Sequence, residues 1–173
     1  MAVATAVKPS LTIKQYFAAS PAQVYKAWTD PKALAQWVGP IGTTAVEAEA
    51  DVRTGGRYRI RMIVPDYEHN VSGVYREVVQ NEKIVLQWEA AEGAAGEGEA
   101  EMAGGGYDTT VTMTFKALDE SRTLVEIAEQ GWRETPAGLK ASYGNCQGWS
   151  QMLCALKVDL EYDGANLRDG MYA

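Results

Sequence analysis

The sequence has one histidine and two cysteines in 173 residues. Zinc sites are built mostly from clusters of these two residue types, so their scarcity leaves no plausible zinc site. Cys146 and Cys154 lie eight residues apart in a segment with helical periodicity. That spacing separates them by about 12 Å along a helix, beyond the reach of a disulfide. We therefore predict neither a metal site nor a disulfide.

Basic residues and long apolar runs are also few. There are 16 Lys and Arg residues against 23 Asp and Glu, which gives a formal charge of −7. Nucleic acids and anionic membrane surfaces both favour a basic protein face, so we expect neither as a partner. No apolar run approaches the roughly 20 residues of a membrane span, and the N-terminus lacks the layout of a signal peptide. We expect a cytoplasmic protein.

Motifs for catalysis and for nucleotide binding are missing as well. The chain has no Gly-x-Ser-x-Gly elbow, and its one histidine, His69, sits in a turn-like stretch at 65–70 with no partner suggested by spacing. The glycines at 104–106 precede a predicted strand, whereas a phosphate-binding loop precedes a helix. Cys146 lies near a predicted helix start, but no base is nearby in sequence. We predict no catalytic residue and no cofactor.

Apolar and polar residues alternate through much of the chain, as they do in strands with one buried face. Strands joined by turns and not by helices indicate an antiparallel sheet with one wet face. On that face, Glu47, Glu49 and Asp51 should pair with Arg57, Arg59 and Arg61 of the next strand. The predicted strands are 11–17, 43–52, 57–64, 71–79, 83–90, 109–118 and 123–130.

Helical signals flank this strand series. Ser20-Pro21 and Asp30-Pro31 each place a capping residue before a proline, which predicts two short helices. Near the C-terminus, Trp149, Leu153, Leu156 and Leu160 form one apolar stripe at helical spacing. Glycines at 138, 144 and 148 weaken the earlier part, so we expect this helix to begin between 142 and 147 and to end near 163–164.

Two motifs carry a family resemblance: Asp51-x-Arg53-x-Gly55-Gly56 and Gly73-Val74-Tyr75-Arg76-Glu77. With the pattern from Ser20 to Pro31 and Gly148-Trp149, they resemble the activator-of-heat-shock-protein-90-ATPase-like branch of the START-related (SRPBCC) superfamily. The resemblance implies an α+β helix-grip fold: a curved antiparallel sheet of six to seven strands, two short helices and one long C-terminal helix closing a cavity.

The expected organisation is a single helix-grip domain over 10–165. Residues 1–9 are expected to form a flexible arm and 166–173 a C-terminal tail. The segment 91–106 is rich in Gly, Ala and Glu and reads as a flexible insert between strands. Whether the insert is a lid over the cavity or a tolerated extension stays open.

The predicted cavity lies between the long helix and the sheet, where one helix cannot fill a concave face. Large rings and flexible thioethers suit an irregular apolar cavity, although the same residues would serve equally as core filling. Glu129 continues the apolar row of Val125 and Ile127, so it is either a polar anchor for a ligand's hydroxyl or amine or a strand-end residue turned outward. The predicted ligand-binding residues are Trp37, Tyr58, Met62, Tyr75, Trp88, Met113, Phe115, Glu129, Trp132, Trp149 and Leu153.

The leading functional hypothesis is binding of a small hydrophobic or aromatic molecule, lipid-like or polyketide-like, in this cavity. The resemblance implies two alternatives. One is a protein-interaction module in the stress response that activates a chaperone ATPase or binds another protein. The other is a cyclase-like or hydrolase-like enzyme that would use Glu129 or His69. A binding protein is favoured because no catalytic motif is found, and homodimer formation stays open.

Overall fold

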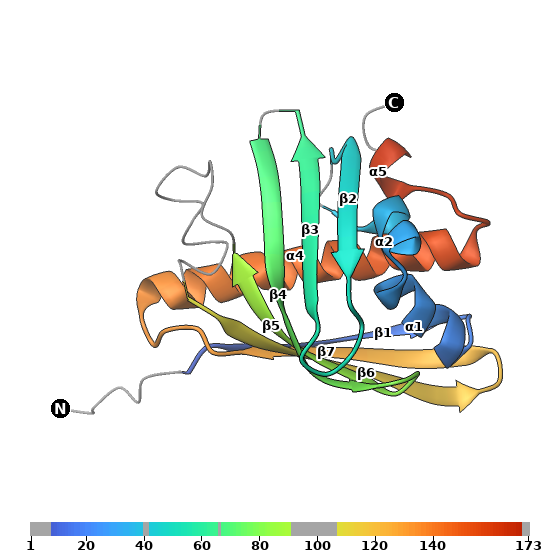
Figure 1. The fold of residues 1–173 in the computed structure, drawn as a ribbon, viewed down its shortest axis with the longest axis horizontal. Coiled ribbons are helices and arrows are strands. Elements are labelled where there is room, and N and C mark those ends of the chain that lie inside the picture. The colour runs from blue at the N-terminus through green and yellow to red at the C-terminus, as the bar shows by residue number, and fades with distance from the viewer. Residues whose placement is uncertain (1–7, 40–41, 66, 91–106, 171–173) are drawn as a thin grey trace.

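Seven antiparallel strands form one sheet in the order β1-β7-β6-β5-β4-β3-β2. This computed structural model describes residues 8–39, 42–65, 67–90 and 107–170. The sheet is strongly twisted, so β2, β3 and β4 stand steeply to β1, β6 and β7, and helix α4 crosses one face (Figure 1). The elements are β1 (Ser10–Phe17), α1 (Pro21–Thr29), α2 (Pro31–Trp37), β2 (Ala45–Ala50), β3 (Arg57–Val64), β4 (Tyr67–Val79), β5 (Lys83–Ala90), β6 (Thr109–Asp119), β7 (Arg122–Gln130), α4 (Pro136–Glu161) and α5 (Leu167–Gly170). The predicted α+β helix-grip architecture is confirmed.

The two short helices begin where the capping signals predicted. Ser20 and Gln23 form a reciprocal capping box at the start of α1. Asp30 ends α1, because its amide donates to the carbonyl of Lys26 over 2.8 Å. The same residue starts α2, because its carboxylate accepts from the amide of Lys32 over 2.9 Å. One aspartate thus sets the corner between α1 and α2, and α2 packs against β2 and α4.

Helix α4 begins at Pro136, earlier than the predicted range of 142–147. Thr135 caps it, with its hydroxyl accepting from the amide of Gly138 over 3.1 Å. Position 138 in the helix has no room for a side chain, because an added Cβ would stand 2.1 Å from the carbonyl oxygen of Arg133. The glycine reflects close packing of the chain on itself and not a weak helix.

The apolar stripe of α4 faces the sheet as predicted. Trp149, Leu153 and Leu156 are buried, and Leu160 is half-buried against the same core. The helix ends at Glu161 and is followed by two residues with positive φ, at 163 and 164, close to the predicted end.

Three further expectations need correction. Strand β4 begins at Tyr67, so His69 lies in a strand opposite Met62 and not in a turn. Strand β2 spans Ala45–Ala50, shorter than the predicted 43–52. A short helix, α5, lies in the segment expected to be a tail.

Segment 166–168 is tied to the end of α2 by hydrogen bonds. The Arg168 guanidinium donates to the carbonyls of Val38 over 2.7 Å and Ala35 over 3.2 Å, and to that of Gln36. The amide of Asn166 donates to the same Gln36 carbonyl over 3.0 Å. These donors satisfy carbonyls that a helix end leaves without partners.

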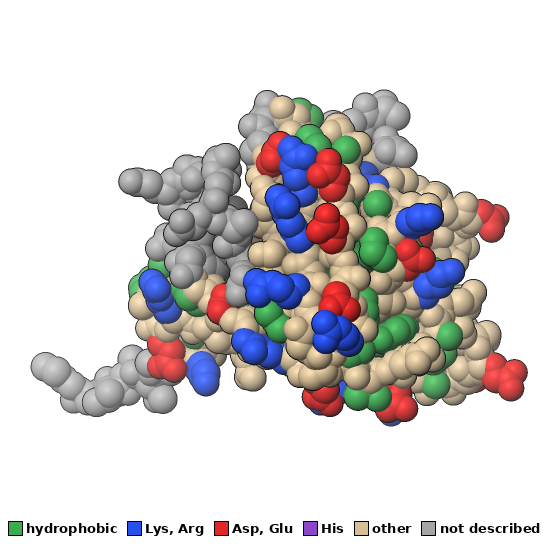
Figure 2. Space-filling model, viewed as in Figure 1, with side chains coloured by type: hydrophobic (Ala, Val, Ile, Leu, Met, Phe, Trp, Pro, Cys, Tyr) green, Lys and Arg blue, Asp and Glu red, His purple; other side chains and the backbone are tan. Residues whose placement is uncertain are grey.

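The outer face of β2, β3 and β4 carries interspersed acidic and basic side chains (Figure 2). Arg61 pairs with Glu47 across the strands over 3.1 Å and also with Glu68. Asp51 pairs instead within its own loop, with Arg53, over 2.8 Å. The predicted cross-strand pairing is therefore seen for Arg61, while Asp51 takes a different partner.

The insert expected at 91–106 and most of the arm expected at 1–9 lie outside the described residues. Among the helices that are described, none is long and apolar enough to cross a membrane.

Candidate functional site

Glu129 lies inside the molecule, between the sheet and α4. On β7, Val125, Ile127 and Glu129 share the inward face, and Glu129 is only 1% exposed. Of the two orientations that the sequence left open, the structure shows the inward one, and the outward alternative is wrong. A carboxyl group buried this deeply requires hydrogen-bond donors around it.

Three side chains supply those donors. The hydroxyl of Thr109 donates to Oε1 of Glu129 over 2.6 Å, and the amide of Asn145 donates to the same oxygen over 2.9 Å. The indole nitrogen of Trp149 donates to Oε2 over 2.6 Å. Thr109 comes from β6, and Asn145 and Trp149 lie one turn apart on α4. The carboxyl group therefore links three elements.

The sequence analysis missed Thr109 and Asn145 as partners. Asn145 stands four residues before Trp149, so both reach the same face of a helix. That spacing was the available signal. Thr109 offered none, because its nearness to Glu129 depends on how β6 pairs with β7.

Burial raises the pKa of Glu129, and the hydrogen bonds from Thr109, Trp149 and Asn145 oppose the rise. Desolvation disfavours the carboxylate, whereas donors favour it. Desolvation dominates, so this carboxyl group keeps its proton to a higher pH than an exposed glutamate does.

Five of the seven predicted aromatic residues, together with Trp28, form a continuous row of rings through the core. Neighbouring ring centres are 4.6–6.1 Å apart, the separation at which aromatic pairs attract one another. Trp28 of α1, which is not among the predicted site residues, also belongs to the row. The order of rings is Tyr75, Tyr58, Trp88, Trp149, Trp28 and Trp37.

Gly73 makes room for this row at the Tyr58 position. The hydroxyl of Tyr58 donates to the carbonyl of Gln87 over 2.7 Å. A Cβ added to Gly73 would stand 2.7 Å from that hydroxyl and 1.9 Å from the Gln87 oxygen. The glycine that opens the second sequence motif thus has a packing role beneath an aromatic ring.

The remaining predicted residues, Met62, Met113, Phe115, Trp132 and Leu153, are all buried in the same core. Phe115 meets the ring of Tyr25 edge-on at 5.7 Å. The structure therefore brings the predicted set together in one core, while ligand contact by these residues stays a prediction.

Two indole N–H groups in this core, those of Trp28 and Trp132, are buried and have no acceptor among the described residues. Trp37 differs, because its N–H donates to the carbonyl of Ala27 over 3.0 Å. A buried donor without an acceptor costs about 1–3 kcal/mol, so each such group requires an explanation.

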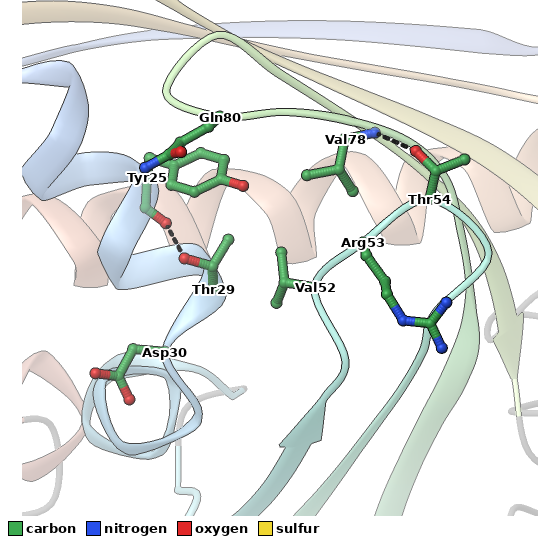
Figure 3. A pocket seen from close by; sticks show the side chains of 8 residues that line it. All are labelled: Tyr25, Thr29, Asp30, Val52, Arg53, Thr54, Val78 and Gln80. Atoms are coloured by element: carbon green, nitrogen blue, oxygen red, sulfur yellow. Dashed lines mark hydrogen bonds between the residues drawn. The ribbon is translucent and has the colours of Figure 1, made fainter.

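A pocket of about 490 Å³ opens away from this core, between α1, the loop after β2 and the end of β4 (Figure 3). None of the eleven predicted residues lines it. We call it the side pocket. Sequence reasoning missed it because three separated segments build it, although the Asp51–Gly56 motif forms one wall. Its lining residues are Tyr25, Thr29 and Asp30, then 52–54, then Val78 and Gln80.

Within the described part of the chain, no group of three or more His, Cys, Asp and Glu side chains is placed to hold a metal ion. Cys146 and Cys154 are both free thiols on α4, as their spacing predicted.

Comparison with known proteins places the chain among similar folds. Residues 18–161 match the model of a family described as "Activator of Hsp90 ATPase homolog 1-like protein". A crystal structure from Chromobacterium violaceum is 25% identical, covers 88% of this chain and 97% of its own, and has a TM-score of 0.66. One from Rhodobacter sphaeroides is 18% identical, with coverages of 91% and 93% and a TM-score of 0.72. A solution structure from Arthrobacter aurescens is 21% identical, with coverages of 88% and 86% and a TM-score of 0.69. No curated protein matches the chain.

Proposed function

The chain belongs to the Activator of Hsp90 ATPase homolog 1-like family, and we propose that it binds a small, largely apolar molecule between the sheet and helix α4. The observation that carries this proposal is the indole N–H of Trp28, which is buried within the row of rings and has no acceptor among the residues that the structure describes. A ligand that lies along the row and brings an oxygen acceptor would satisfy that donor.

The lining favours a ligand with flat or extended apolar surface. Five of the predicted residues are rings in one row, and aromatic faces offer large contact area in fixed geometry. Met62 and Met113 add flexible thioethers that adapt to an irregular shape. The ligand class is therefore a fused-ring or chain-like molecule with at least one carbonyl or ether oxygen.

Glu129 has a positioning role in this proposal. Its two oxygens already accept from three donors, which leaves little capacity for a ligand. Its bond to Trp149 holds that ring in the row between Trp88 and Trp28. Replacing Glu129 should alter affinity through the orientation of Trp149.

The test uses 2-acetylnaphthalene, which has one carbonyl, and naphthalene, which has none. Quenching of the intrinsic tryptophan fluorescence reports binding. We expect both to bind, and acetylnaphthalene more tightly. Trp28→Phe should weaken acetylnaphthalene binding by about 2- to 10-fold, which corresponds to the loss of one hydrogen bond. The affinity for naphthalene should not change. Trp37→Phe is the matched control, because the N–H of Trp37 is already paired. If neither compound binds, the proposal is excluded.

A protein partner is the second candidate, and the family's description as an activator of the Hsp90 ATPase favours it. We propose a direct arm of the test: purified Hsp90 is assayed for ATP hydrolysis with and without this chain. Stimulation by the wild type, unchanged in Trp28→Phe, would support the chaperone-activator function and separate it from the interior site.

A further inference from the structure

The side pocket has walls that hydrogen bonds hold in place. The amide of Val78 donates to the hydroxyl of Thr54 over 3.2 Å, which ties the loop after β2 to the end of β4. The amide of Gly55 donates to the carbonyl of Tyr75 over 2.8 Å, and the amide of Tyr75 donates to the carbonyl of Gly56 over 2.9 Å. A ligand would meet a preformed pocket, so little ordering would oppose its binding.

Glycine is needed in this loop for two separate reasons. Gly55 has a φ of +84°, a conformation that side-chain-bearing residues rarely adopt. A Cβ on Gly56 would stand 1.9 Å from the carbonyl oxygen of Asp51. The sequence motif therefore fixes the shape of one wall of the side pocket.

The charged groups of the side pocket already have partners. Arg53 donates to Asp51 from Nε over 3.1 Å, and its Nη2 lies 2.8 Å from the other carboxylate oxygen. Asp30 accepts from the amide of Lys32 and caps α2. A charged ligand would have to compete with these pairs, so the lining favours a neutral one.

Apolar side chains line opposite sides of the side pocket. Figure 3 shows Tyr25 and Thr29 of α1 opposite Val52 and Val78. The hydroxyl end of Tyr25 points toward these two valines. Tyr25, Val52 and Val78 also pack against the core, which holds them in position. These apolar side chains favour a ligand with apolar surface.

The hydroxyl of Tyr25 is a polar group available to a ligand. Among the described residues none is hydrogen-bonded to it. The Tyr25 ring is held edge-on by Phe115, so the hydroxyl has a fixed direction. A phenol is protonated at neutral pH, and burial raises the pKa of Tyr25 further, so its hydroxyl can donate.

We propose that the side pocket is a second binding site, separate from the interior one, for a neutral aromatic molecule with one carbonyl group. The ring lies against Val52 and Val78, across the side pocket from α1, and the carbonyl oxygen accepts from the hydroxyl of Tyr25. The volume of about 490 Å³ falls within the range of about 300–1,000 Å³ typical of small-molecule sites.

The test is a two-dimensional proton–nitrogen NMR titration of the full chain with three probes. Acetophenone has a ring and a carbonyl, ethylbenzene lacks the acceptor, and benzoate adds a negative charge. We expect acetophenone to shift the amide signals of residues 52–54 and 78 and to bind more tightly than either other probe. Tyr25→Phe should weaken acetophenone binding by about 2- to 10-fold and leave ethylbenzene unchanged.

A filled-pocket pair gives a second measurement. Val78→Trp fills the side pocket and should abolish the acetophenone shifts at 52–54. Val79→Trp is the matched control, because Val79 is the exposed next residue of β4, does not line the pocket, and should leave those shifts intact.

Three results would overturn the proposal: unchanged acetophenone affinity in Tyr25→Phe, tighter binding of benzoate, or shifts confined to α4 and β7. The last would place acetophenone at the interior site, supporting the proposed function while removing this one. Loss of interior binding in Trp28→Phe with intact shifts at 52–54 would separate the two sites in the other direction.

Discussion

The indole nitrogen of Trp149 donates a hydrogen bond to Oε2 of Glu129 over 2.6 Å, so helix α4 and strand β7 are joined through the middle of the core. Apolar contacts elsewhere in this interface have no direction, whereas this bond fixes both the rotation and the height of the helix. The ring that it holds is the one that connects Trp88 to Trp28. The carboxyl group thus sets the geometry of the proposed interior site.

Removing that carboxyl group should be costly. In Glu129→Ala, the donors of Thr109, Asn145 and Trp149 lose their common acceptor in the core. We expect the free energy of unfolding to fall by about 3 kcal/mol or more, because each buried donor left unpaired costs about 1–3 kcal/mol. Urea denaturation measures the change.

Glu126→Ala is the control on the same strand. Glu126 points outward, is 36% exposed and pairs with Lys14 over 2.9 Å. A surface pair of this kind contributes about 1 kcal/mol or less. Equal losses in the two variants would contradict the assignment of Glu129 as the polar link between α4 and the sheet.

Two glycines of α4 should respond to alanine in opposite directions. Gly148 has open space where a Cβ would go, so Gly148→Ala should raise the free energy of unfolding by about 0.5–1 kcal/mol through helix propensity. Gly138→Ala should lower it by about 2 kcal/mol or more, since its Cβ would stand 2.1 Å from the carbonyl oxygen of Arg133. Thermal unfolding of both variants measures the two shifts, and a gain for both would refute the close contact at Gly138.

These two glycines also explain why the start of α4 was not predicted correctly from the sequence. Helix propensity treats Gly138 and Gly148 alike, and on that basis the first two turns of α4 were not predicted. Only the fold shows that Gly138 sits against Arg133. His69 was misplaced for a related reason: the turn signal at Pro65 was extended over the first residues of β4, whose pairing with β3 overrides local propensity.

The candidate site was predictable in part. Alternation along β7 allowed an inward Glu129, because period two is intrinsic to a strand, but the sequence also left open an outward turn at the strand end. The order of rings from Tyr75 to Trp37 was not predictable, since those residues come from β3, β4, β5, α1, α2 and α4. The side pocket was likewise out of reach, because its walls meet only once the loop after β2 docks on Val78.

Arg168 should contribute to stability although it lies close to the C-terminus. Its guanidinium donates to several carbonyls at the end of α2, including that of Val38 over 2.7 Å. Arg168→Ala should lower the free energy of unfolding by about 1.5–3 kcal/mol, the range for hydrogen bonds that involve charged groups. Lys32→Ala, at an exposed position of the same helix α2, should change it by less than about 0.5 kcal/mol. No difference between these variants in urea denaturation would exclude Arg168 as a cap for α2.

Glu129 should give the fold a pH dependence of defined sign. Burial raises its pKa above the ordinary value of 4.5 despite three hydrogen bonds. Between the unfolded and folded pKa values the folded chain therefore holds more protons than the unfolded chain, and the free energy of unfolding falls as pH rises. The contribution is fully present below pH 4.5 and is lost as pH rises through the folded pKa.

Glu129→Gln isolates this effect, because glutamine has a similar shape and does not titrate. We expect the free energy of unfolding of the wild type, minus that of the variant, to be largest near pH 4 and to shrink toward pH 8 in urea denaturation. Glu68 and Asp119, whose pKa values are lowered by Arg61 and Arg122, give the opposite slope. They are present in both proteins, so their contributions cancel in the difference. A difference that grows with pH would mean that the three donors outweigh burial and that Glu129 is ionised in the folded chain throughout this range.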